Sequence, residues 1–389
     1  MIAGMSSTSA TPIPSARIAS IDALRGVVML LMLVDHSREF FYLHAQVRDP
    51  MDLATTPPEL FFTRLLAHLC APVFVLLTGL AAALYGDARG GRGAAAGFLL
   101  KRGLFLIVLE WTVVNFAWTF DPTPSVIYLQ VIWAIGLSMV ALAALLYLPR
   151  PALIGIGVLL AFGHNLLDGI AAPPGGPGHV LWSVLHERGF IELPGGARAR
   201  TSYPVLPWVG VIALGYALGP WFARQVAPVA RQRRLAATGA GALLLFALLR
   251  ALNGYGEPVP WQVQGDALTT AMRLLNLTKY PPSADFLLLT LGIGLLLLAA
   301  LERWGGGLVR MLAVFGAAPL FFYLLHLYLL HAINRVAGLA THSGPALVSV
   351  PNVASLWLLA GAVAVPCWFL CRRFAAVKRR SGAAWMRYL

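Results

Sequence analysis

Apolar runs of roughly 20 residues recur along the whole chain, and they constrain the fold more than any other feature of the sequence. A helix of that length is long enough to cross the hydrocarbon core of a bilayer. The runs expected to form helices are approximately 22–43, 60–85, 98–120, 126–148, 151–167, 204–222, 235–251, 284–302, 308–334 and 352–374. The sequence therefore predicts an all-α polytopic membrane bundle of about ten transmembrane helices.

The composition agrees with a membrane protein. Of the 389 residues, 59% are hydrophobic and 12% are charged, which is about half the charged fraction of an average soluble domain. No polar stretch is long enough to form a separate soluble domain. We expect a flexible tail over 1–16, a single transmembrane domain over 17–376 and a basic cytoplasmic tail over 377–389.

The basic residues predict the orientation of the helices. The net charge is +13, but the lysines and arginines lie in short clusters between apolar runs, which indicates a topology signal and not a nucleic-acid site. The clusters follow the even-numbered helices, as at 224–234 and 372–380. Because cytoplasmic loops are enriched in Lys and Arg, both termini are predicted to be cytoplasmic.

The cysteines and the two longest loops give weaker signals. Cys70, Cys367 and Cys371 lie in apolar segments, so we expect neither a disulfide framework nor a metal site. The loops 168–203 and 252–283 are rich in Gly and Pro and are predicted to form turns and not a folded domain. They lie on the outer side, either as a cap over a membrane cavity or as ordinary exposed loops.

The first predicted helix carries an unusual set of ionisable residues. Arg25 and His36 are eleven residues apart, close to three turns, so they share one face at a separation of about 16 Å. Asp22 and Glu39 join this face at a spacing of three residues, and Asp35 precedes His36. Ionisable groups inside a membrane usually face a cavity or one another. The alternative is a set of interhelical salt bridges.

Three other helices carry candidate polar groups. His68 and Arg64 are one turn apart and either line a cavity or bond to another helix. Glu110, a lone carboxylate in an apolar run, is predicted to form a structural ion pair with Arg64 or Arg25. His326 lies deep in its helix and is a second candidate for proton transfer or thioester contact.

Polar and aromatic residues also cluster at the predicted outer side. His164, Asn165 and Asp168 end the fifth helix, where they either cap the helix or bind an acceptor. Four aromatic residues near the outer interface are predicted to form an aromatic belt, with a sugar-stacking platform as the alternative: Trp118, Tyr203, Trp208 and Tyr280.

Several segments together resemble a known family. The segment 17–41 contains Ser20-Ile21-Asp22-Ala23-Leu24-Arg25-Gly26 and Asp35-His36-Ser37-Arg38, and further similarity lies in 71–79, 163–168, 203–208, 279–283 and 321–326. These segments resemble the bacterial membrane family related to the catalytic domain of heparan-alpha-glucosaminide N-acetyltransferase. The Arg25-to-His36 spacing is also similar to the Arg-and-His motif of the broader acyltransferase-three superfamily.

The resemblance implies acetyl transfer across the bacterial inner membrane. Acetyl-CoA is used from the cytoplasm, and the acceptor is an amine or hydroxyl of an extracytoplasmic glycan, lipid or small molecule. The animal enzyme has asparagine at the position of His36 and its proposed catalytic histidine further along the helix. His44 is the closest residue to that position in this chain.

Acetyl transfer needs a base that accepts the proton of the acceptor, hydrogen-bond donors that stabilise the developing oxyanion, and groups that bind the anionic CoA. The catalytic candidates are His36, Asp35, Glu39, His44 and His326. The candidates for binding the acyl donor are Arg25, Asp22, Lys101 and Arg102. The candidates for binding the acceptor are His68, His164, Asn165, Asp168, Trp208, Lys279 and Tyr280.

Two other functions compete with acetyl transfer. A proton-coupled secondary transporter would use Asp35, His36 and Glu39 as a relay, and a purely structural membrane protein would need no such charge cluster. Direct transfer and a covalent acetyl-histidine step are both compatible with the sequence. The oligomeric state stays open, a homodimer included.

Overall fold

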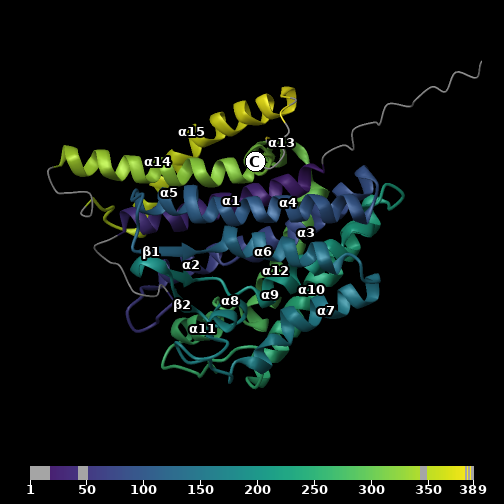
Figure 1. Ribbon diagram of the computed structural model, residues 1–389, viewed down its shortest axis with the longest axis horizontal. Helices are drawn as coiled ribbons and strands as arrows, with labels where there is room; N and C mark the ends of the chain where they lie inside the picture. Colours follow the sequence, from purple (N-terminus) through teal and green to yellow (C-terminus); the bar gives the residue numbers. More distant parts are fainter. Residues whose placement is uncertain (1–17, 43–50, 342–347, 382, 384–385, 387–389) are drawn as a thin grey trace, which may run out of the picture.

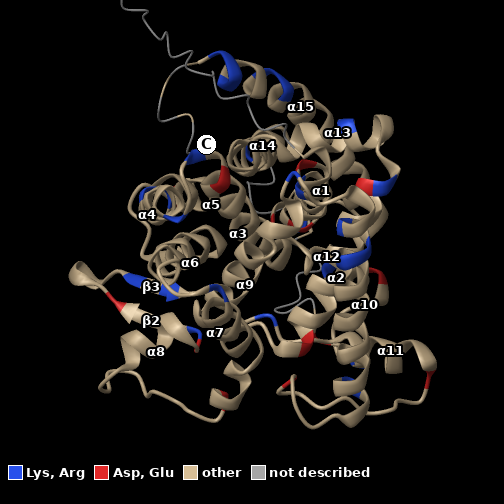
Figure 2. Cartoon of the chain, turned by 90° about the vertical axis from the view of Figure 1, so that its right-hand side faces the viewer, with Lys and Arg blue, Asp and Glu red and all other residues tan. Residues whose placement is uncertain are grey.

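The computed structural model describes residues 18–42, 51–341, 348–381, 383 and 386, and these residues are mostly helical (Figure 1). The chain runs through α1 (Ala19–Phe41), α2 (Pro58–Ala67), α3 (Cys70–Arg89), α4 (Arg92–Leu109), α5 (Asn115–Thr119), α6 (Val131–Leu145), α7 (Arg150–Phe162), α8 (His179–Leu185), α9 (Leu206–Ala217), α10 (Pro228–Leu252), α11 (Ala267–Leu275), α12 (Ala284–Trp304), α13 (Gly306–Gly316), α14 (Pro319–Ala340) and α15 (Val353–Arg380). Figure 2 shows α1, α4 and α14 nearly end-on, so these helices run in a common direction.

The lengths and hydropathies of the helices agree with a membrane protein. Five helical stretches in the described residues are long and apolar enough to cross a bilayer: Pro58–Arg89, Pro228–Leu252, Ala284–Trp304, Pro319–Ala340 and Val353–Arg380. Shorter apolar helices pack among them, including α6 and α7. The number of ten spans and the cytoplasmic location of both termini stay predictions.

Several predicted helices are interrupted in the structure. The predicted helix 60–85 is divided into α2 and α3, and the first residues of the predicted helix 126–148 form the strand Val126–Leu129. The predicted helix 308–334 is wrong as one element, because it breaks into α13 and α14 before Pro319. Proline lacks an N–H and fits the first turn of a helix better than its interior. The predicted helix 98–120 contains the π-helical turn Glu110–Val114 between α4 and α5, and such turns widen a helix locally.

A small sheet corrects the expectation for the outer loops. β1 (Val126–Leu129) pairs in parallel with β3 (Arg198–Thr201), which pairs antiparallel with β2 (Gly189–Glu192). The segment 168–203 thus contains α8 and two strands, and 252–283 contains α11. Figure 1 shows β1, β2, α8 and α11 gathered at one end of the bundle. The sequence missed the sheet because β3 finds its partner about 70 residues away along the chain.

Glycines allow the closest helix contacts. A Cβ atom added at Gly26 of α1 would lie 2.0 Å from the carbonyl oxygen of Leu312 in α13. A Cβ atom at Gly79 of α3 would lie 2.0 Å from the carbonyl oxygen of Ile212 in α9, and Gly215 faces α3 in the same way. Small residues that bring backbones together are typical of membrane helix packing. These contacts fix α1 and α3, which both contribute residues to the cavity described below.

We predict that Gly79→Ala destabilises the protein by about 1–3 kcal/mol, because the backbone of α9 must move to admit the methyl group. Thermal unfolding in detergent measures the loss. Gly97→Ala in α4 is the control, since nothing lies within 4 Å of its added Cβ atom, and it should leave stability unchanged or slightly raised. Equal melting temperatures for the two variants would contradict the close contact.

Candidate active site

A cavity of about 370 Å³ runs along α1 and joins its two charged ends. The residues that α1 contributes to the wall are Arg25, Met29, Met32, Asp35, His36 and Glu39. Their spacing of three and four residues is that of one helix face. The prediction that Arg25 and His36 share a face is therefore confirmed, and that face lines a common space.

The end of the cavity near Arg25 is basic. Arg25, Arg102 of α4 and Lys378 of α15 line it. Asp22 does not line the cavity; its carboxylate binds Arg25 Nη1 at 2.9 Å, while Arg25 Nη2 donates to the carbonyl oxygen of Leu77. Lys101 is exposed and is not part of the wall. Of the four predicted donor-binding residues, Arg25 and Arg102 therefore reach the cavity.

A cluster of ion pairs surrounds the other end, near His36. Asp35 forms a short contact with Arg64 of α2 and lies 3.4 Å from Arg38 Nε. Arg38 also forms a short ion pair with Glu39. Lys279 adds another cation to the cavity wall. Asp35 is thus engaged in ion pairs with two arginines. The next residue, His36, is therefore the better candidate for accepting a proton.

His36 and His326 form a hydrogen-bonded pair. His36 Nδ1 lies 2.7 Å from His326 Nε2, and His326 Nδ1 lies 2.7 Å from the carbonyl oxygen of Phe322. A carbonyl oxygen only accepts, so in the neutral pair His326 donates from Nδ1 and accepts at Nε2. His36 then donates from Nδ1, and the lone pair of its Nε2 has no hydrogen-bond donor among the residues that the structure describes. His326 lies behind His36 and is not part of the cavity wall.

Aromatic rings form the cavity wall around His36. Trp118 contacts the His36 ring edge-on, with 4.9 Å between ring centroids, and Tyr203, Tyr280 and Tyr323 also line the cavity. Trp208 is fully buried beside Tyr203. The predicted aromatic belt is therefore wrong for these residues, because they face the protein interior. The sequence alone did not give the direction in which these rings point.

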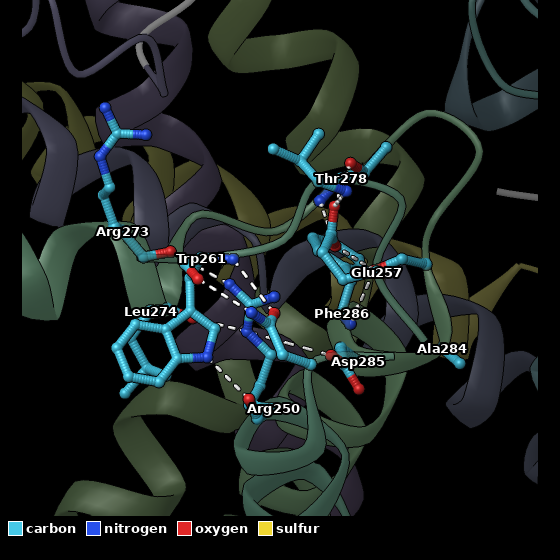
Figure 3. Close-up of polar contacts among 12 residues, drawn as sticks. Arg250, Glu257, Trp261, Arg273, Leu274, Thr278, Ala284, Asp285 and Phe286 are labelled. Atoms are coloured by element: carbon cyan, nitrogen blue, oxygen red, sulfur yellow. Dashed lines mark hydrogen bonds and ion pairs between the residues drawn. The ribbon is translucent and has the colours of Figure 1, made fainter. Parts of the chain in front are cut away.

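A carboxylate outside the cavity holds the turn that carries Lys279 and Tyr280. Glu257 accepts hydrogen bonds from the backbone N–H and the hydroxyl of Thr278 and from the hydroxyl of Ser283. Both ends of the turn are thereby fastened to one side chain. Figure 3 shows Glu257 and Thr278 facing each other beside Asp285. Arg250 lies next to this group and donates to the carbonyl oxygens of Arg273 and Leu274.

Most predicted acceptor-binding residues do not reach the cavity described here. Lys279 and Tyr280 line it, whereas His68 is buried against Phe286 and Trp208 lies behind Tyr203. The remaining three lie at the end of α7: His164, Asn165 and Asp168. His44 falls outside the described residues.

The group at the end of α7 packs against the turn 278–283. His164 Nε2 bonds to the carbonyl oxygen of Pro282, and Asn165 accepts from the backbone N–H of Ala284. His164 is buried, with 2% of the residue exposed. Asn165 and His164 thus support the cavity wall from behind.

Glu110 does not form the predicted ion pair. It is fully buried, and its carboxylate accepts from the backbone N–H groups of Gln130 and Trp133. These groups lie at the start of α6, where the first N–H groups of a helix have no partner within the helix. Glu110 is therefore a cap for α6. The π-helical turn that begins at Glu110 lies against β1, just before α6.

Sequence reasoning missed two wall residues with clear roles. Arg64 was predicted to line a cavity or to bond to another helix but was not named as a site residue; it lines the cavity and binds Asp35. Its charge inside an apolar run was the available signal. Lys378 was assigned to the basic tail, but α15 continues past it to Arg380 and brings it to the cavity.

Comparison with known proteins identifies a family. The model of the family described as heparan-alpha-glucosaminide N-acetyltransferase, catalytic, matches residues 17–251, more than half of the chain. No curated protein matches the chain. The matched region extends from α1 to α10 and contains Arg25, His36, Arg64 and Arg102.

We predict that Glu257→Gln loosens the turn 278–283, because the amide group presents N–H donors where Thr278 and Ser283 also donate. Unsatisfied buried polar groups cost about 1–3 kcal/mol. Hydrogen exchange of the Thr278 amide should become faster. Glu192→Gln, on an exposed position of β2, is the matched control, and unchanged exchange at Thr278 in the Glu257 variant would contradict this role.

Proposed function

The chain belongs to the family of the heparan-alpha-glucosaminide N-acetyltransferase catalytic domain, and from this premise we propose that it is an integral-membrane acetyltransferase. It takes the acetyl group from cytoplasmic acetyl-CoA and transfers it to an amine or hydroxyl of a glycan, lipid or small molecule on the other side of the membrane. The observation that supports this proposal most is one cavity with Arg25 and His36 on the same wall.

The basic end of the cavity suits the anionic part of CoA. Arg25, Arg102 and Lys378 supply positive charge there, and guanidinium groups bind phosphates well. The eleven residues from Arg25 to His36 span about 16 Å, which suits an extended pantetheine arm along α1. In this arrangement the Arg25 end faces the cytoplasm, as the basic clusters predict for a bacterial inner membrane.

His36 is the proposed general base. Its Nε2 lone pair takes the proton of the acceptor amine or hydroxyl as that atom attacks the thioester carbonyl carbon. The C–S bond then breaks, and the thiolate of CoA takes the proton from His36 to leave as the thiol. His326 orients His36 through the 2.7 Å hydrogen bond at Nδ1. An acetyl-histidine step would use the same Nε2 nitrogen.

The charges around His36 favour the transition state of this reaction. Negative charge develops on the thioester oxygen during attack. Arg64 and Lys279 both line the cavity at this end and are the cations proposed to stabilise that oxygen. In this proposal Asp35 and Glu39 hold the arginines in place through their ion pairs. The proton of the acceptor is transferred to His36.

We predict that Arg102→Gln weakens acetyl-CoA binding by about 10- to 100-fold, since a charge-assisted hydrogen bond contributes about 1.5–3 kcal/mol. Isothermal titration of the purified protein in detergent measures the affinity. Lys101→Gln removes the same charge one position away, where the side chain is exposed and does not line the cavity. Equal effects of the two substitutions would argue against donor binding in this cavity.

We predict that His36→Ala lowers acetyl transfer by about 10²–10⁴-fold, because the general base is lost. Release of CoA in the presence of amine and hydroxyl acceptors measures the reaction. Thermal stabilisation by acetyl-CoA should persist in this variant, because Arg25 and Arg102 are unchanged.

The pair His36 and His326 provides an internal comparison. His326→Gln keeps an acceptor for the N–H of His36 and should retain more activity than His326→Leu, which leaves that donor without its partner. If acetyl-CoA neither stabilises the wild-type protein nor yields CoA with any acceptor, the acetyltransferase assignment fails and proton-coupled transport is favoured.

A further inference from the structure

Outside the cavity, three side chains with metal-binding atoms meet at the outer end of α7. His164 begins the short 3-10 helix that follows α7, Asp168 comes directly after that helix, and His186 comes directly after α8. One nitrogen or oxygen atom from each of the three residues lies within 4.8 Å of the others. His186 Nε2 is 3.4 Å from Asp168 Oδ1. The cluster joins two segments that are about 20 residues apart in the sequence.

The His164 ring has one nitrogen that nothing in the described protein satisfies. Its Nε2 bonds to the carbonyl oxygen of Pro282 at 2.9 Å, whereas its Nδ1 is buried without a hydrogen-bond partner. The residue is only 2% exposed. Buried polar atoms nearly always have a hydrogen-bond partner or a ligand, so this nitrogen points to a bound group that the protein itself does not supply.

The other two side chains are held in place by neighbours. Asn165 Nδ2 donates to Asp168 Oδ2, which leaves Oδ1 directed at His186. The His186 ring stacks on Trp182 at 4.9 Å between centroids. Hydrogen bonds from a second layer of residues, such as those of Pro282 and Asn165, are typical of metal sites, where they orient the ligands.

We propose that His164, Asp168 and His186 bind one zinc ion, with water as the fourth ligand. Two imidazole nitrogens and a carboxylate oxygen form a ligand set that zinc accepts. At zinc–ligand distances of about 2.0–2.1 Å, two ligands of a tetrahedron lie about 3.4 Å apart, which agrees with the distance between His186 and Asp168. Asp168 is exposed, so a small rotation of its carboxylate about the hydrogen bond to Asn165 closes the remaining distance.

Binding changes the tautomer of His186. In the described structure His186 Nε2 is 2.9 Å from the backbone carbonyl oxygen of His164, to which it donates. The zinc ion replaces that bond, and the proton moves to Nδ1, as in other zinc-bound histidines that keep one N–H for a neighbour. No proton is released by a neutral imidazole that binds in this way.

The ion would stabilise the wall of the cavity and take no part in the transfer itself. It links the end of α7 to the segment after α8, and His164 connects it to Pro282 in the turn that carries Tyr280. The proposal departs from our expectation of no metal, which rested on the cysteines alone. The three ligands come together only through the fold of the segment 168–203, for which the sequence predicted turns.

The test uses the full chain, purified in detergent, stripped of metal with a chelator and titrated with zinc chloride. We expect one zinc ion per chain by elemental analysis and a rise in the melting temperature, whereas magnesium should produce no rise because it prefers oxygen ligands. His164→Ala and Asp168→Asn should each weaken zinc binding at least tenfold. Asp168 is exposed, so its variant remains informative if the His164 variant does not fold.

His179→Ala is the matched control. His179 lies in the same outer segment, and its two nitrogens are near the carbonyl oxygens of Ala172 and Phe190, outside the cluster. It should bind zinc as tightly as the wild type. Absence of zinc binding, or equal affinity in the Asp168→Asn, His164→Ala and wild-type proteins, would overturn the proposal. These readouts are independent of acetyl transfer, so their failure leaves the proposed enzyme function untouched.

Discussion

The ion pairs of Asp35 are the interaction on which the site depends. A carboxylate inside an apolar bundle loses its water, and the loss of several kcal/mol is offset only if cations and hydrogen bonds replace that water. Asp35 has Arg64 on one side and Arg38 on the other. Because Arg64 belongs to α2, the pair fixes the rotation of α1 against its neighbour. His36 is the next residue, and the same rotation directs it to the cavity.

The remaining packing gives this cavity two different ends. Gly26 and Gly316 allow α13 to lie directly against α1 near Arg25, and the break before Pro319 lets α14 take another direction. At the far end the turn 278–283 brings Lys279 and Tyr280 to the wall. One end is therefore rich in cations that suit phosphates, and the other combines a histidine pair with aromatic rings that suit an acceptor.

The sequence was informative where the signal is local and periodic. The face of α1 followed from spacing, because ionisable residues in a membrane helix rarely face lipid. The helical bundle followed from hydropathy, and the family followed from motifs spread over the chain. These features need no knowledge of which helices are neighbours.

The prediction from the sequence was wrong, or absent, where the role of a residue depends on a partner that is distant along the chain. Glu110 caps α6 and does not pair with an arginine, since the start of α6 lies beside it in the fold. Trp118 and Tyr203 face the cavity, although belt residues and cavity residues look alike in sequence. The same holds for the partner of β3 and for the meeting of His164 with His186, which depend on chain segments far apart.

The most direct test of the central claim is a cryo-electron microscopy structure with a non-hydrolysable thioether analogue of acetyl-CoA. The account predicts density for the pantetheine arm along α1, with the nucleotide near Arg25 and Arg102 and the acyl carbon beside His36. Density outside this cavity, or an acyl group that lies far from His36 when the analogue is fully bound, would contradict the claim that one continuous space on α1 connects the donor to the catalytic histidine.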